Sequence, residues 1–166
     1  MHPDLQRALD ALRAGVAGLD ESALARRPPE GWSVAQVLEH LARGYAGTAY
    51  ILNRCLEQGR TKARPVTWRD RVGGFVVVDL GWLPRGRQAP EVTRPSDAPS
   101  GDVLAQAEAA LRLLDATAAR VEARFGPRTR LANHPLLGPF DVRQWRRFHF
   151  IHTRHHLKQI ARLRAL

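Results

Sequence analysis

Four stretches of the chain place apolar residues three and four positions apart, which is the spacing of one helix face. These stretches lie at about 3–19, 33–58, 101–125 and from 141 to the C-terminus. No set of segments shows the strict alternation of a half-buried sheet. Because each apolar face must be buried against another element, the pattern predicts an all-α four-helix bundle. The length of 166 residues predicts a single domain, residues 1–166.

Two of these helices begin with a recognisable capping pair. Ser33 and Gln36 form an S-x-x-Q capping box, and Asp141 and Gln144 form a second pair of the same kind. The second helix is expected to end before Gly59.

A connection of about forty residues, rich in proline, glycine and arginine, joins the second and third helices. Within it, residues 68–84 fit either a short helix or an extended segment. A helix of about 25 residues is roughly 38 Å long, and a connection of this length can return along it. We therefore expect the second and third helices to be parallel, and the fourth to be antiparallel to both.

The formal net charge of +10 raises the question of a nucleic-acid partner. Only Lys62 and Lys158 among the 26 basic residues are lysines, and the arginines are spread along the chain. This distribution favours ordinary solvated charge over a nucleic-acid interface.

Cysteine content and hydropathy indicate the compartment. A single cysteine, Cys55, excludes an intrachain disulfide and favours a reducing environment. The N-terminus does not resemble a signal peptide. The longest apolar cluster is too short to span a bilayer and contains Asp79. We expect a cytoplasmic protein without a membrane partner.

Four of the seven histidines lie in the stretch HFIHTRHHLKQI, residues 149–160. His152 and His156 are one helical turn apart and point the same way. Such a pair can chelate one metal ion, but a stable site needs a third ligand from elsewhere.

His40 is the candidate for that ligand, because it flanks the apolar Val37/Leu41 face of the second helix. It lies about seven residues from the start of that helix. In an antiparallel partner the same level falls near Lys158, within one turn of His156. A hydrogen-bonded core histidine is the alternative, and spacing alone leaves both interpretations open.

Competing site types are not supported. No glutamate follows His152, so the H-E-x-x-H zinc-protease pattern is absent. Cys55 lies roughly 22 Å along the helix from His40, too far to join its site. Neither a glycine-rich phosphate loop nor a G-x-S-x-G elbow occurs.

The stretches GWSVAQVLEHLA and, much later, HTRHHLKQI resemble the DinB-like superfamily of metal-binding four-helix bundles. The family pattern is a Trp-Ser helix start with a histidine seven residues on, followed by H-x-x-H-H-x-x-Q on the last helix. Two further stretches resemble a less characterised branch of the same superfamily, LPRGRQAP and NHPLLGPF. The resemblance implies an up-down-down-up bundle with a long crossover between the second and third helices.

It also implies that His40, His152 and His156 are the metal ligands. Three imidazoles suit a divalent metal, zinc or nickel first, with iron or copper as alternatives. The resemblance further implies a homodimer, as in many family members, and the transfer of a low-molecular-weight thiol to an electrophile, as in some of them. The residues after the double histidine, Leu157-Lys158-Gln159, depart from the common Arg-Gly-Gln. Thiol-binding and catalytic residues therefore stay unassigned.

Three classes of function follow. The first is a metal-dependent enzyme with a small-molecule substrate, either a thiol transferase or, if water is activated instead, a hydrolase. The second is a metal-binding or stress-associated protein without catalysis. The third is a nucleic-acid binder, whose affinity would fall steeply with salt.

Other residues are given subordinate roles. Gln159 either orients a metal ligand or makes a plain helix hydrogen bond. We expect His149 to be packed in the interior and His134 to structure its loop. The remaining expectations are core positions for Trp32 and Trp145, a supporting or structural role for His155, and disorder for His2.

Overall fold

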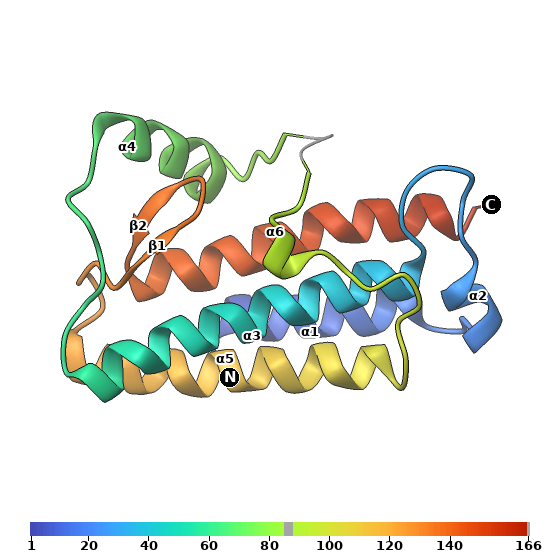
Figure 1. The fold of residues 1–166 in the computed structure, drawn as a ribbon, viewed down its shortest axis with the longest axis horizontal. Helices are drawn as coiled ribbons and strands as arrows, with labels where there is room; N and C mark the ends of the chain where they lie inside the picture. Colours follow the sequence, from blue (N-terminus) through green and yellow to red (C-terminus); the bar gives the residue numbers. More distant parts are fainter. Residues whose placement is uncertain (85–87, 166) are drawn as a thin grey trace.

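The computed structural model describes residues 1–84 and 88–165. Its helical character confirms the predicted all-α class, with two short strands in addition (Figure 1). The four long helices are α1 (Pro3–Val16), α3 (Val34–Gln58), α5 (Val103–Phe125) and α6 (Val142–Leu163).

The long helices pack as two pairs, α3 with α5 and α1 with α6, and contacts between the pairs join them. Figure 1 shows α3 and α5 side by side and running in the same direction. Helix α6 begins at the end of the bundle where α3 and α5 finish. The first half of α3 therefore lies at the level of the second half of α6.

The apolar stripes of these helices form the core. Fully buried side chains come from all four long helices: Leu5, Leu9, Leu12, Leu38, Leu41, Leu52, Leu111, Leu114 and Ile160. Burying each such side chain contributes about 1.5–3 kcal/mol. The buried Tyr45 hydroxyl is satisfied by Thr153 Oγ1 at 2.6 Å. Within the described ranges, none of the helices combines the length and apolar character needed to traverse a bilayer.

Both predicted capping boxes are confirmed. The Ser33 hydroxyl accepts a hydrogen bond from the Gln36 N–H at 3.2 Å, and Gln36 Oε1 accepts one from the Ser33 N–H at 3.0 Å. Asp141 and Gln144 form the same reciprocal pair at the start of α6. These pairs fix the first residues of the two helices that carry His40, His152 and His156.

The N-terminal region differs from the prediction. Helix α1 ends at Val16 rather than near residue 19, and Gly18 adopts a left-handed φ of 76°. A short helix, α2 (Glu21–Ala25), follows, with Asp20 as its N-cap. Because α2 spans little more than one turn, its apolar periodicity is too short to detect in the sequence.

The expectation that His2 is disordered is wrong. Its ring Nδ1 accepts a hydrogen bond from the Asp4 N–H at 3.3 Å and caps α1. Its backbone N–H donates to Asp115 Oδ1 at 3.0 Å, which ties the N-terminus to α5.

The crossover between α3 and α5 has its own secondary structure. The segment left open between helix and extended chain is helical, as α4 (Trp68–Gly74) and a π-helical turn, η1 (Phe75–Asp79). A 3-10 turn, η2 (Glu91–Thr93), follows before α5. Val77 and Val78 are buried, and η1 packs against α6.

A small hairpin between α5 and α6 was not predicted. Strands β1 (Ala132–His134) and β2 (Gly138–Phe140) pair antiparallel, with Ala132 opposite Phe140. Gly138 has a φ of 78°, and a Cβ there would lie 2.3 Å from the Asp70 carboxyl group. Strands of three residues are too short for alternation to appear in the sequence.

Replacing Asp141 with alanine should remove the N-cap of α6. We expect Asp141→Ala to lower the free energy of unfolding by about 1 kcal/mol, because the Gln144 N–H loses its acceptor. Asp141→Asn is the matched control, since asparagine caps equally well. Urea unfolding measures both variants, and equal losses would contradict the capping role.

Candidate metal centre

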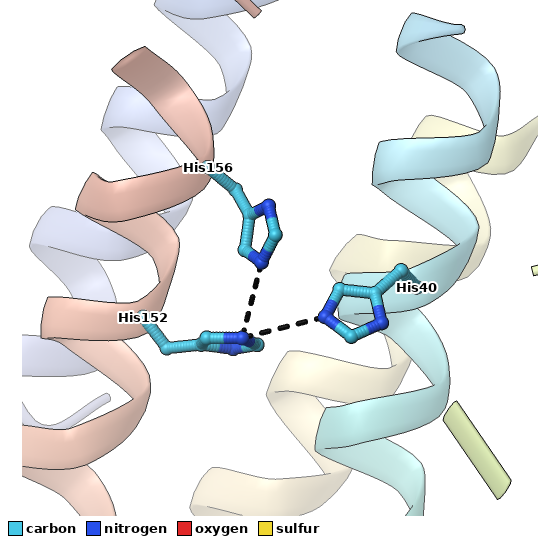
Figure 2. Close-up of side chains that lie close together, drawn as sticks. All are labelled: His40, His152 and His156. Atoms are coloured by element: carbon cyan, nitrogen blue, oxygen red, sulfur yellow. Dashed lines mark hydrogen bonds between the residues drawn. The ribbon is translucent and has the colours of Figure 1, made fainter. Parts of the chain in front are cut away.

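The three histidines singled out in the sequence lie together between α3 and α6. Figure 2 shows His40 facing His152 and His156 across the gap between the two helices. His152 Nε2 lies 3.3 Å from His40 Nε2 and 3.1 Å from His156 Nε2. One ligand atom from each ring lies within 4.8 Å of the others. The predicted level of His40 relative to α6 therefore agrees with the structure.

Oxygen acceptors fix the protonation of two of these rings. His40 Nδ1 lies 2.8 Å from the carbonyl oxygen of Thr93, and His156 Nδ1 lies 3.1 Å from Gln159 Oε1. Because these oxygens can only accept, each Nδ1 carries the hydrogen. In the neutral ring the Nε2 atom then has a lone pair, which points into the cluster.

His152 completes the cluster but cannot form hydrogen bonds with both neighbouring Nε2 atoms. Its Nε2 contacts two nitrogen lone pairs and carries at most one hydrogen. Its buried Nδ1 has no hydrogen-bond partner in the part of the chain that the structure describes. Neither tautomer of His152 satisfies all three Nε2 atoms, whereas a cation among them would be bound by all three.

The geometry and chemistry of the donor set fit a divalent metal ion. Two nitrogens bound to zinc at 2.0–2.1 Å with a tetrahedral angle are about 3.3 Å apart, close to two of the contacts in the cluster, 3.3 and 3.1 Å, and all three ligand atoms lie within 4.8 Å of one another. Burial lowers the pKa of His40 and of His152, and it lowers the pKa of His156 to about 3. All three imidazoles are therefore neutral near pH 7, which is the form that binds metal.

A crossover segment that we call the strap, residues 93–97, holds the acceptor of His40 in place. Glu39 accepts hydrogen bonds at 2.9 Å from the backbone N–H and the hydroxyl of Ser96. Burial raises the pKa of the Glu39 carboxyl, but the hydrogen bonds from Ser96 and Arg43 and the Arg43 charge together outweigh that effect, and the pKa is lowered. The strap thereby keeps the Thr93 carbonyl against the His40 ring. Sequence reasoning missed Thr93, because nothing local links residues 53 positions apart.

Another buried histidine, His149, lies on α6 nearer the start of the helix than His152. His149 is buried, as expected, and its Nε2 lies 2.9 Å from the Thr48 hydroxyl. Burial lowers the pKa of His149 to about 3, and that of His134 to about 4. His134 Nδ1 accepts from the Leu136 N–H at 3.2 Å, so His134 structures its loop, also as expected.

The remaining singled-out residues lie in the core or beside the cluster. Trp145 is in the core, and Trp32 is partly buried against it, with its ring centroid 5.0 Å from that of His40. His155 is half-buried beside His156, at 5.3 Å between ring centroids. Gln159 Oε1 accepts the Nδ1–H hydrogen bond of His156, a contact compatible with both roles that the sequence left open for it.

A helical bundle that gathers three imidazoles from two facing helices defines a class of candidate metal-binding proteins. The chain belongs to the DinB superfamily, whose family model matches residues 4–160. This match confirms the resemblance and includes all three histidines of the cluster. Neither the curated proteins nor the solved structures gave a match.

The buried His149 should make the metal-free protein sensitive to acid. Its pKa is about 3 when folded and about 6.5 when unfolded, so between these values only the unfolded chain gains a proton. The stability contribution is complete above pH 6.5 and falls by about 1.4 kcal/mol per pH unit below it.

We therefore expect the wild-type protein to lose about 2 kcal/mol more than His149→Gln between pH 7 and pH 5. Denaturant unfolding in the presence of a chelator measures the difference. Equal losses in the two proteins would show that His149 titrates normally in the fold.

Proposed function

We propose that this protein is a metal-dependent enzyme that transfers a low-molecular-weight thiol to a small electrophile. His40, His152 and His156 are the proposed ligands of a divalent metal, with zinc or nickel favoured. Membership of the DinB superfamily supports this assignment. The observation that carries it is the convergence of three Nε2 atoms that the protein cannot pair among themselves.

The chain's own residues supply the rigid part of the mechanism. The Thr93 carbonyl and Gln159 Oε1 hold the rings of His40 and His156 by their Nδ1–H groups. A divalent ion bound by three neutral imidazoles keeps its full charge and an open position, and it would lower the pKa of a thiol or water placed there. Preorganised rings avoid a reorganisation cost when the site is used.

The thiol is proposed to come from a small molecule rather than from the protein. Cys55 is fully buried on α3, and its Sγ donates to the Leu131 carbonyl at 3.5 Å. Burial also raises the pKa of this thiol, which disfavours the nucleophilic thiolate.

The same proposal includes the architecture. We infer that residues 1–166 form one domain with up-down-down-up topology, which the shared direction of α3 and α5 in Figure 1 supports. The long crossover is then the return path that parallel neighbours require.

Metal analysis of protein purified without a histidine tag tests the site. We expect about one metal ion per chain in the wild type and at most a trace in His152→Ala/His156→Ala. His155→Ala is the matched control, because it removes a neighbouring imidazole of the same helix. Equal metal content in the wild type and the double variant would refute the site.

Turnover distinguishes an enzyme from a protein that only binds metal. Metal-loaded protein is screened with small thiols and electrophiles and the products are followed by mass spectrometry. Thiol adducts that depend on His152 and His156 support the transferase. Products of water alone assign a hydrolase, and no turnover with the site occupied assigns a non-catalytic metal-binding protein.

We also propose a homodimer. The crossover exposes large apolar side chains on one stretch, with 70% of Trp68 and 55% of Val72 and Phe75 exposed. Contiguous exposed apolar surface of this kind marks interaction sites.

Sedimentation at micromolar concentration tests that proposal. We expect a dimer for the wild type and a monomer for Trp68→Lys/Phe75→Lys, because the added charges would be buried unpaired. The control is Leu113→Lys, which charges an apolar residue that is 56% exposed on α5. A wild-type monomer, or a dimer that both variants retain, would contradict the assignment.

A further inference from the structure

A cavity lies next to the histidine cluster, against α6. Its volume is about 140 Å³, and it is bounded by residues 81–83 of the crossover and by Ile151, Arg154, His155 and Lys158 of α6. It is therefore formed where the chain after η1 crosses the helix that carries His152 and His156.

Two cationic side chains line this cavity without a carboxylate. Arg154 and Lys158 are four residues apart on α6, so they lie on the same helix face. Neither forms an ion pair with an acidic group in residues 1–84 and 88–165. The Arg154 guanidinium instead lies 5.6 Å from the centroid of the Phe150 ring. Like charges at this spacing destabilise a helix, and an anion between them would relieve the repulsion.

Three apolar side chains also line the cavity. Ile151 is buried, Leu83 is partly buried, and 61% of Trp82 is exposed at the rim. An indole beside two cations suits a small organic anion, because the ring covers the carbon part while the cations bind the charge. The volume of about 140 Å³ is comparable to that of a cavity that holds one small aromatic molecule.

His155 connects this cavity to the cluster. It lines the cavity, and its ring centroid lies 5.3 Å from that of His156. A ligand in the cavity would thus be separated from His156 only by the His155 ring.

We propose that this cavity binds the carboxylate or phosphate group of the small molecule on which the protein acts, with Arg154 and Lys158 as its binding residues. The substrate class is then a small organic anion. Binding of the anion stands on the cavity alone, whereas its role as part of the substrate rests on the proposed function.

Calorimetric titration with benzoate, phenyl phosphate and the uncharged benzamide tests the proposal. We expect wild-type protein to bind one or both anions in preference to benzamide. Arg154→Gln/Lys158→Gln should weaken that binding by roughly tenfold or more, since each charged hydrogen bond contributes about 1.5–3 kcal/mol. The matched control, Arg112→Gln/Arg120→Gln, removes the same net charge from exposed positions on α5.

Three results would overturn the anion site: no anion binding by the wild type, unchanged binding by the pocket variant, or equal weakening in the control. Each titration is run on metal-free and on metal-loaded protein. Anion binding that persists without metal supports the cavity even if metal analysis refutes the histidine site. Anion binding that requires the metal and is retained by the pocket variant assigns the anion to the metal and overturns the cavity.

Discussion

The function inferred for this bundle depends on one contact between helices, the approach of three imidazole Nε2 atoms where α3 faces α6. Two of the rings are held from behind by oxygen acceptors, so the Nε2 lone pairs of His40 and His156 both face Nε2 of His152. A buried arrangement of this kind is unfavourable unless a cation fills it. The bundle therefore keeps an incompletely hydrogen-bonded group of nitrogen ligands in its interior, which is a property of sites built for a ligand rather than for stability.

The long crossover contributes more than a return path between α3 and α5. Its strap, residues 93–97, brings the Thr93 carbonyl to His40. The earlier part of the crossover, after η1, lies against α6 and forms with it the cavity that Arg154 and Lys158 line. The cluster and the cavity are thus completed by one irregular segment laid over a regular bundle. This is how loops on a rigid scaffold commonly produce function.

Much of the fold and of the candidate site was predictable because it depends on local patterns. Helical periodicity, two capping boxes and the four-residue spacing of His152 and His156 are all contained within single turns of helix. The level of His40 followed from helix lengths and the long connection. Thr93, Trp82 and the β1–β2 hairpin were not predictable, because their positions depend on tertiary packing across many residues. Of the two residues that hold the rings from behind, Thr93 and Gln159, Gln159 had a local signal, because it lies three residues from His156.

The proposed function requires that the cluster holds a metal ion. An anomalous-scattering map of crystals grown with zinc or nickel tests it most directly. We predict a single strong anomalous peak about 2.0–2.2 Å from the Nε2 atoms of His40, His152 and His156. We also predict that Nδ1 of His40 keeps its hydrogen bond to Thr93 in the loaded protein. Metal bound elsewhere, or an empty cluster under saturating metal, would contradict the proposed function.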